Sequence, residues 1–154
     1  MAADSPRAKS PQSVLFACGM NSIRSPMASE LTRALFPKIY AVSAGVRKTD
    51  LDPFAIIAME EIGRDIRKHR PRTLDELEDL EGFNFDLIVT LSPEAHHKAL
   101  ELTRTVAADV EYWPTPDPAA TEGAREQRLD AYRGVRDGLM ERIRRRFGTV
   151  KSAA

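Results

Sequence analysis

The residues of this sequence best suited to chemistry lie near its start, where Cys18, the single cysteine of the chain, is followed six residues later by Arg24. An apolar run precedes Cys18 and Ser25-Pro26 follows Arg24, which predicts a strand, a tight loop and the first turn of a helix. Backbone N–H groups of such a loop, placed at a helix N-terminus, form a binding site for an oxyanion. The same positive field favours the thiolate of Cys18, its nucleophilic form. The planar fork of Arg24 can hold two phosphate oxygens.

A lone cysteine after an apolar strand is more often a small buried residue than a nucleophile. The spacing of Cys18, Arg24 and Ser25 and the strand–loop–helix setting favour the nucleophile. Residues 18–26 also resemble the active-site signature of the low-molecular-weight protein tyrosine phosphatases, a Cys, five residues and Arg-Ser, followed by Pro. The matching positions are Cys18, Asn21, Arg24, Ser25 and Pro26.

The resemblance implies that the loop binds the substrate's phosphate through its backbone amides and Arg24. The residues concerned are Gly19, Met20, Asn21, Ser22, Ile23, Arg24 and Ser25. Two positions depart from the family pattern, because Met20 stands where a Gly is usual and Ile23 where many members have a second Cys. Ser25 is placed to donate a hydrogen bond to the sulfur of Cys18. The resemblance further implies that Asn21, Ser43 and His69 brace the loop, and Asn tolerates the left-handed backbone that a tight loop needs.

Cleavage of a phosphate ester by a thiolate also needs a proton donor for the leaving oxygen. Asp117 lies among three prolines in residues 113–118, just past a predicted strand, which presents it on the same rim as Cys18. An Asp-Pro pair is equally suited to a turn or a helix N-cap, so residue type alone leaves both roles open. The resemblance favours the general acid, because the family carries its acid in a late Asp-Pro pair.

The elements that must position these residues alternate between strands and helices along the chain. Apolar patterning predicts strands at residues 13–18, 39–42, 86–91 and 110–113 and helices at 25–36, 53–63, 73–80, 92–103 and 129–147. Asp52 reads as a helix N-cap, Gly63 as a helix end, and Thr73 with Glu76 as a capping box. We therefore expect an α/β fold of three layers, a four-stranded parallel sheet flanked by helices on both faces, of the low-molecular-weight phosphatase kind.

Length, charge and cysteine content limit the number of domains, the partners and the location that the sequence leads us to expect. The 154 residues carry 23 basic and 23 acidic side chains, a balance that gives no reason to expect nucleic acid or a membrane as partner. We expect one domain over residues 13–150, preceded by a disordered leader or vector remnant at residues 1–12. A single cysteine suits a reducing, cytoplasmic location, and no metal or cofactor is expected. The sequence does not indicate an oligomeric state.

The predicted function is metal-independent hydrolysis of a phosphomonoester, carried by a protein or a small molecule, through a phosphocysteine. Phosphotyrosine in proteins is the expected form, although Ala119 and Ala120 follow Asp117-Pro118 where aromatic residues are common in the family. Tyr112 or Trp113 is then the remaining candidate for an aromatic wall. Two alternatives stay open: an arsenate reductase that uses an external thiol, and a non-catalytic module that binds phosphate or phosphopeptides.

Overall fold

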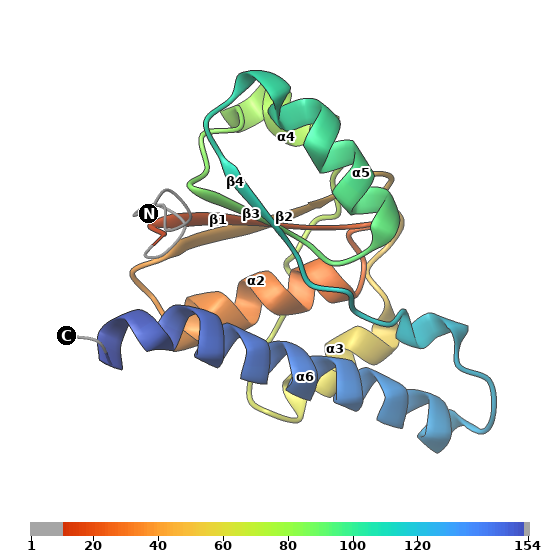
Figure 1. Ribbon diagram of the computed structural model, residues 1–154. Coiled ribbons are helices and arrows are strands. Elements are labelled where there is room, and N and C mark those ends of the chain that lie inside the picture. Colours follow the sequence, from red (N-terminus) through yellow and green to blue (C-terminus); the bar gives the residue numbers. More distant parts are fainter. Residues whose placement is uncertain (1–10, 153–154) are drawn as a thin grey trace.

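The computed structural model describes residues 11–152 and places four strands between two layers of helices (Figure 1). In chain order the elements are β1 (Ser13–Cys18), α2 (Arg24–Leu35), β2 (Tyr40–Gly45), α3 (Pro53–Glu60), α4 (Leu74–Glu81), β3 (Leu87–Thr90), α5 (Pro93–Leu102), η1 (Thr103–Thr105), β4 (Asp109–Tyr112), η2 (Pro118–Ala120) and α6 (Arg125–Ser152). The strands are all parallel, in the order β2-β1-β3-β4. The predicted α/β architecture with a four-stranded parallel sheet is confirmed.

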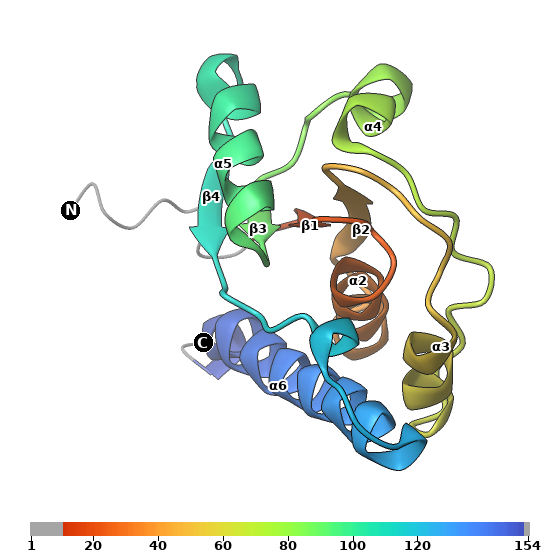
Figure 2. The same ribbon diagram turned by 90° about the vertical axis from the view of Figure 1, so that its right-hand side faces the viewer.

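The two faces of the sheet follow from the alternation of side chains along β1. Val14 and Phe16 pack on one face in the cluster that includes residues of α2, α3 and α6, whereas Leu15 and Ala17 pack on the other face against α4 and α5. Because β1 and β3 are covered on both sides (Figure 2), their sequences are nearly continuous apolar runs. Trp113 closes the first cluster, with its ring 5.9 Å from that of Phe16.

The predicted helix starts at Asp52 and Thr73 are confirmed, whereas α6 begins at Arg125, four residues before the predicted 129, and the predicted ends of α3 and β2 are wrong. The Asp52 carboxylate accepts the N–H of Phe54, and Thr73 and Glu76 form a reciprocal capping box. However, α3 ends at Glu60 rather than Gly63, because the chain tightens into a turn in which Gly63 has a φ of +77°. Similarly β2 continues to Gly45 instead of ending at residue 42, since β1 pairs with it as far as Cys18.

The long helix α6 is fastened to α3 by two arginines. Arg136, which is buried, donates to the carbonyl of Ala58 at 2.7 Å and to Glu61 at 3.0 Å. Arg133 donates to both oxygens of the same Glu61, and these bonds hold the pKa of Glu61 down at about 2. This attachment fixes α6 beside the loop that leads out of β4 (Figure 1).

The leader predicted at residues 1–12 lies, for residues 1–10, outside the described residues. Pro11 and Gln12 are described: Pro11 is buried, and the main chain of Gln12 bonds to two distant segments. Its carbonyl accepts the N–H of Tyr40 and its own N–H donates to Asp86, both at 2.8 Å. Among the helices that the structure describes, none has the length and apolar character to cross a membrane.

Candidate active site

Cys18 ends β1 at the carboxyl edge of the sheet, and residues 19–23 form the loop that leads into α2. Figure 2 looks onto this edge, where the loops leaving β1 and β4 lie. The Cys18 side chain is only 2% exposed, but its sulfur meets polar partners. It accepts the N–H of Asn21 at 3.3 Å, and the Ser25 hydroxyl oxygen lies 2.9 Å away. The loop therefore wraps around the sulfur. Cys18 is buried, but its sulfur contacts polar groups and does not serve only as a small apolar side chain of the core.

Asn21 is the residue that connects this loop to the rest of the fold. It is fully buried and has a φ of +53°, a left-handed backbone that Asn tolerates better than most residues. Its side-chain N–H groups donate to the hydroxyls of Ser25 and Ser43, both at 2.9 Å. Its side-chain oxygen accepts the N–H of Arg72 at 2.9 Å. A buried amide with all these partners holds the loop in one shape.

His69 lies on the other side of Asn21, with its Nε2 3.2 Å from the Asn21 carbonyl oxygen. A carbonyl only accepts, so this nitrogen carries the proton and donates. Burial lowers the pKa of His69 below its ordinary 6.5, and the positive charges of Arg72 and Arg33 act in the same direction, against the opposing bond to Asn21. The structure thus brings together the three residues predicted as braces, Asn21, Ser43 and His69.

The loop presents open backbone donors next to the sulfur. Within residues 11–152, the amides of Met20, Ser22 and Ile23 donate to no protein acceptor, and no side chain caps the start of α2. Uncapped N–H groups at a helix N-terminus carry partial positive charge and suit an oxyanion. Gly45 of β2 lies directly behind, since a Cβ there would fall 2.7 Å from the Asn21 nitrogen.

Arg24 and Asp117 complete the same cavity, which has a volume of about 330 Å³. Its lining residues are Cys18, Met20, Ser22, Ile23, Arg24, Thr49, Asp50, Leu51, Asp52, Pro53, Asp117 and Ala119. One guanidinium N–H of Arg24 donates to the Thr115 carbonyl at 3.0 Å, which ties the loop carrying Asp117 to the loop carrying Cys18. Asp117 also caps η2, accepting the N–H of Ala119 at 3.0 Å. Both roles left open for Asp117 are therefore compatible with its position.

Comparison with known proteins now identifies the family. Residues 13–153 match the family described as low molecular weight phosphotyrosine protein phosphatase. The chain belongs to this family. An arsenate reductase of Bacillus licheniformis is 34% identical over 137 residues, covering 88% of this chain and 95% of the relative. A glutaredoxin arsenate reductase of Synechocystis is 31% identical over 132 residues, covering 84% and 92%. The tyrosine phosphatase Wzb of Escherichia coli K30, solved with sulphate, has the same fold, with a TM-score of 0.74 at 21% identity, covering 90% and 98%.

Within this family fold, the sequence prediction missed the wall formed by residues 49–53. Asp52 was predicted only as a helix cap, yet it lines the cavity, and its second carboxylate oxygen accepts the hydroxyl of Tyr132 at 2.8 Å. Asp50 and Leu51 line the cavity as well. The one signal for this wall is the position of the Asp-rich segment after the second strand. Thr115 and Arg72 contact Arg24 and Asn21 through main-chain groups. Such contacts cannot be predicted from the type of residue at these positions.

The idea that Tyr112 or Trp113 supplies an aromatic wall is wrong. Trp113 is 2% exposed and packs in the core with Phe16, while the ring of Tyr112 stacks on His96 with centroids 4.8 Å apart. Among the described residues, no aromatic side chain lines the Cys18 cavity. Nor do three His, Cys, Asp or Glu side chains gather anywhere in residues 11–152 as a metal site requires.

Proposed function

We propose that this protein hydrolyses phosphomonoesters through a phosphocysteine formed on Cys18. The observation that carries the proposal is that Cys18, Arg24 and Asp117 line one cavity although Asp117 lies almost a hundred residues away in the sequence. Membership of the phosphatase family supports the same reaction class. A module that only bound phosphate would need neither a nucleophile nor an acid beside it.

In the first step, the Cys18 thiolate attacks phosphorus and the bond from phosphorus to the ester oxygen breaks. Asp117 gives its proton to the departing oxygen, so that an alcohol or phenol leaves rather than its anion. Arg24 and the open amides of the loop hold the other three oxygens and balance their charge.

In the second step, Asp117 is a carboxylate and takes a proton from water as the water attacks phosphorus. The bond from phosphorus to sulfur breaks, inorganic phosphate is released, and Cys18 returns to its thiolate. The hydroxyl of Ser25, 2.9 Å from the sulfur, donates to the thiolate as it forms, which makes sulfur a better leaving group.

Phosphotyrosine in proteins is the substrate that we propose within this class. In place of an aromatic wall, Met20, Ile23 and Leu51 offer apolar contacts to a phenyl ring in the cavity. A reducing, cytoplasmic location would keep the thiol of Cys18 in its active form.

Hydrolysis of p-nitrophenyl phosphate in the presence of EDTA tests the reaction class. The parent protein turns over without added metal, and Cys18→Ser lowers kcat by at least about 1,000-fold because the nucleophile is lost. Inorganic phosphate still raises the melting temperature of Cys18→Ser, since the amides and Arg24 remain. Phosphate binding by the parent without any turnover would instead indicate the binding module.

Arsenate reduction is a second candidate, favoured by the names of the arsenate reductases of Bacillus licheniformis and Synechocystis, which are 34% and 31% identical to this chain. Cys18 would displace water from arsenate, and an external thiol would then attack the Cys18 sulfur. The sulfur–arsenic bond breaks, arsenite leaves with two electrons, and Cys18 is left in a mixed disulfide that a second thiol reduces. The external thiol is needed because the chain has one cysteine. An assay with arsenate, glutathione and glutaredoxin that yields no arsenite removes this candidate.

A further inference from the structure

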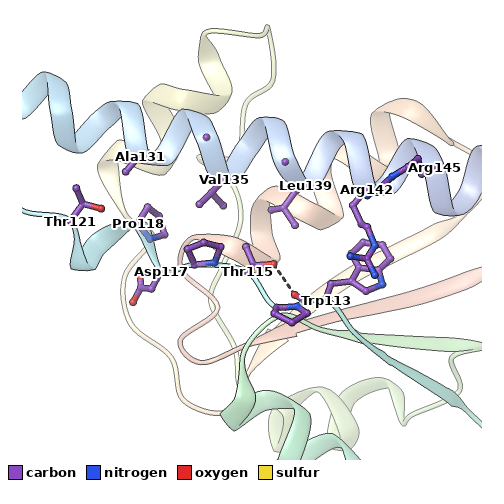
Figure 3. A pocket seen from close by; sticks show the side chains of 14 residues that line it. Trp113, Thr115, Asp117, Pro118, Thr121, Ala131, Val135, Leu139, Arg142 and Arg145 are labelled. Carbon is purple, nitrogen blue, oxygen red and sulfur yellow. Dashed lines mark hydrogen bonds between the residues drawn. The ribbon is translucent and has the colours of Figure 1, made fainter.

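A second cavity, of about 440 Å³, lies between the proline-rich loop and α6 (Figure 3). It is lined by Trp113, Pro114, Thr115, Pro116, Asp117, Pro118, Thr121, Ala131, Gly134, Val135, Gly138, Leu139, Arg142 and Arg145. We call it the α6 groove. The side chains of Val135 and Leu139 point from the helix toward the loop, and the Asp117 carboxylate points away from α6.

The α6 groove is a neighbour of the Cys18 cavity, since Asp117 lines both. The loop between them is held by the bond from Arg24 to the Thr115 carbonyl. A substrate whose phosphate is seated against Cys18 and whose chain continues past Asp117 therefore reaches the groove. A small phosphomonoester is accommodated by the Cys18 cavity alone and does not.

Two glycines of α6 keep the groove open. A Cβ added at Gly134 or Gly138 would meet nothing within 4 Å, so packing inside the fold does not require glycine at either position. Glycine disfavours a helix interior, and the fold would gain from a larger residue there. On the opposite wall, three prolines offer rings and carbonyls but no N–H groups, which suits side-chain contacts better than strand pairing.

The basic side chains of the α6 groove are placed at the end away from Asp117. Arg142 and Arg145 line that end, and the Arg142 guanidinium lies over the Trp113 ring, 5.0 Å from its centroid. Stacking leaves the edges of a guanidinium available as donors. The groove is therefore apolar along Val135 and Leu139 and basic beyond them, which is complementary to an apolar residue followed by a carboxylate.

We propose that the α6 groove binds the polypeptide segment next to the phosphorylated residue of a protein substrate, with an apolar side chain on Val135 and Leu139 and an acidic one at Arg142. This deepens the proposed function, on which it rests, by assigning a separate binding site to the polypeptide beside the phosphorylated residue.

Binding and hydrolysis of phosphotyrosine peptides test the proposal. Two peptides carry the sequence Leu-Glu, one before and one after the phosphotyrosine. In two further peptides, Leu-Lys replaces Leu-Glu at the same place. Binding is measured by fluorescence anisotropy on Cys18→Ser, and kcat/KM on the active protein. We expect Gly138→Leu, which fills the groove, and Arg142→Glu, which reverses its charge, each to weaken binding of one Leu-Glu peptide about tenfold. The same changes lower kcat/KM for that peptide and leave p-nitrophenyl phosphate within twofold, because the reacting groups are untouched.

Matched changes on the same helix serve as controls. Glu141→Leu adds an apolar side chain and Arg144→Glu reverses a charge, at exposed positions outside the groove, and neither should alter peptide binding. The Leu-Lys peptide should bind Arg142→Glu more tightly than the Leu-Glu peptide does, because its lysine then faces a carboxylate. Equal peptide binding by parent and Gly138→Leu overturns the groove proposal. Groove-dependent binding without hydrolysis by the parent overturns the proposed function and leaves the groove in place.

Discussion

At the scale of single residues, the candidate site depends on side chains that each meet partners from distant parts of the chain. Asn21 contacts Ser25 in the first turn of α2, Ser43 in β2 and the main chain at Arg72. Arg24 joins the Cys18 loop to Thr115. The chemistry therefore requires that several segments be folded at once, and the roles of individual residues can be separated by substitution.

Asp117→Asn separates the proton donor from the binding groups. An amide cannot protonate a leaving oxygen, so phenyl phosphate turnover should fall by about 100-fold or more. Esters with good leaving groups, such as p-nitrophenyl phosphate, should slow much less in the first step. Steady-state kcat/KM for a series of aryl phosphates measures the difference. The same loss for every leaving group would remove Asp117 from the acid role.

His69 should make the fold sensitive to mildly acidic pH. Its pKa in the folded protein is below the ordinary 6.5 because the ring is buried, so the unfolded chain takes up the proton first as pH falls. Stability is then unaffected above about pH 6.5 and declines as pH drops through that value toward the lower folded pKa. Melting temperatures from pH 7.5 to 5 should fall less for His69→Gln, which keeps a donor but does not titrate. If the melting temperatures of the parent and His69→Gln fell equally with pH, His69 would not be the group that makes stability depend on pH.

At the scale of elements, the approach of β2 to the catalytic loop is the most demanding contact. A Cβ on Gly45 would lie 2.4 Å from the Arg47 oxygen and 2.7 Å from the Asn21 nitrogen, both main-chain atoms that cannot turn aside. Gly45→Ala should therefore displace the loop, lower stability by about 1–3 kcal/mol and reduce kcat/KM.

Gly134→Ala, with open space around it, should raise stability by about 0.5–1 kcal/mol with unchanged p-nitrophenyl phosphate kinetics. Chemical denaturation and steady-state rates compare the two.

The elements were predictable where local chemistry decides them. Apolar runs marked β1 and β3, and the caps at Asp52 and Thr73 follow from side chains that bond their own main chain. The Gly63 helix end was placed too late because tightening of the α3 terminus depends on main-chain bonds that residue type does not encode. The closeness of Asp117 to Cys18 came from sheet topology and the resemblance, whereas the use of Thr115 and Arg72 through their main chains could not be foreseen.

At the scale of the whole molecule, the chain has one sulfur nucleophile and no second thiol to protect it. Peroxide should therefore carry Cys18 past the sulfenic acid, because no intramolecular disulfide can form. Inactivation by excess peroxide should not be reversed by dithiothreitol, and bound phosphate should slow it by covering the sulfur. Mass spectrometry of the Cys18 peptide should show the sulfinic or sulfonic acid. Full recovery of activity with dithiothreitol after strong oxidation would argue against this.

The most direct measurement is to quench the protein with acid during turnover of p-nitrophenyl phosphate and locate the phosphate by mass spectrometry. The proposed reaction requires phosphate bonded to the sulfur of Cys18 in the parent, with none in Cys18→Ser. Asp117→Asn should accumulate more of the intermediate, because its hydrolysis needs a base. Turnover without any phosphate on Cys18, or turnover that survives in Cys18→Ser, would show that this sulfur is not the nucleophile.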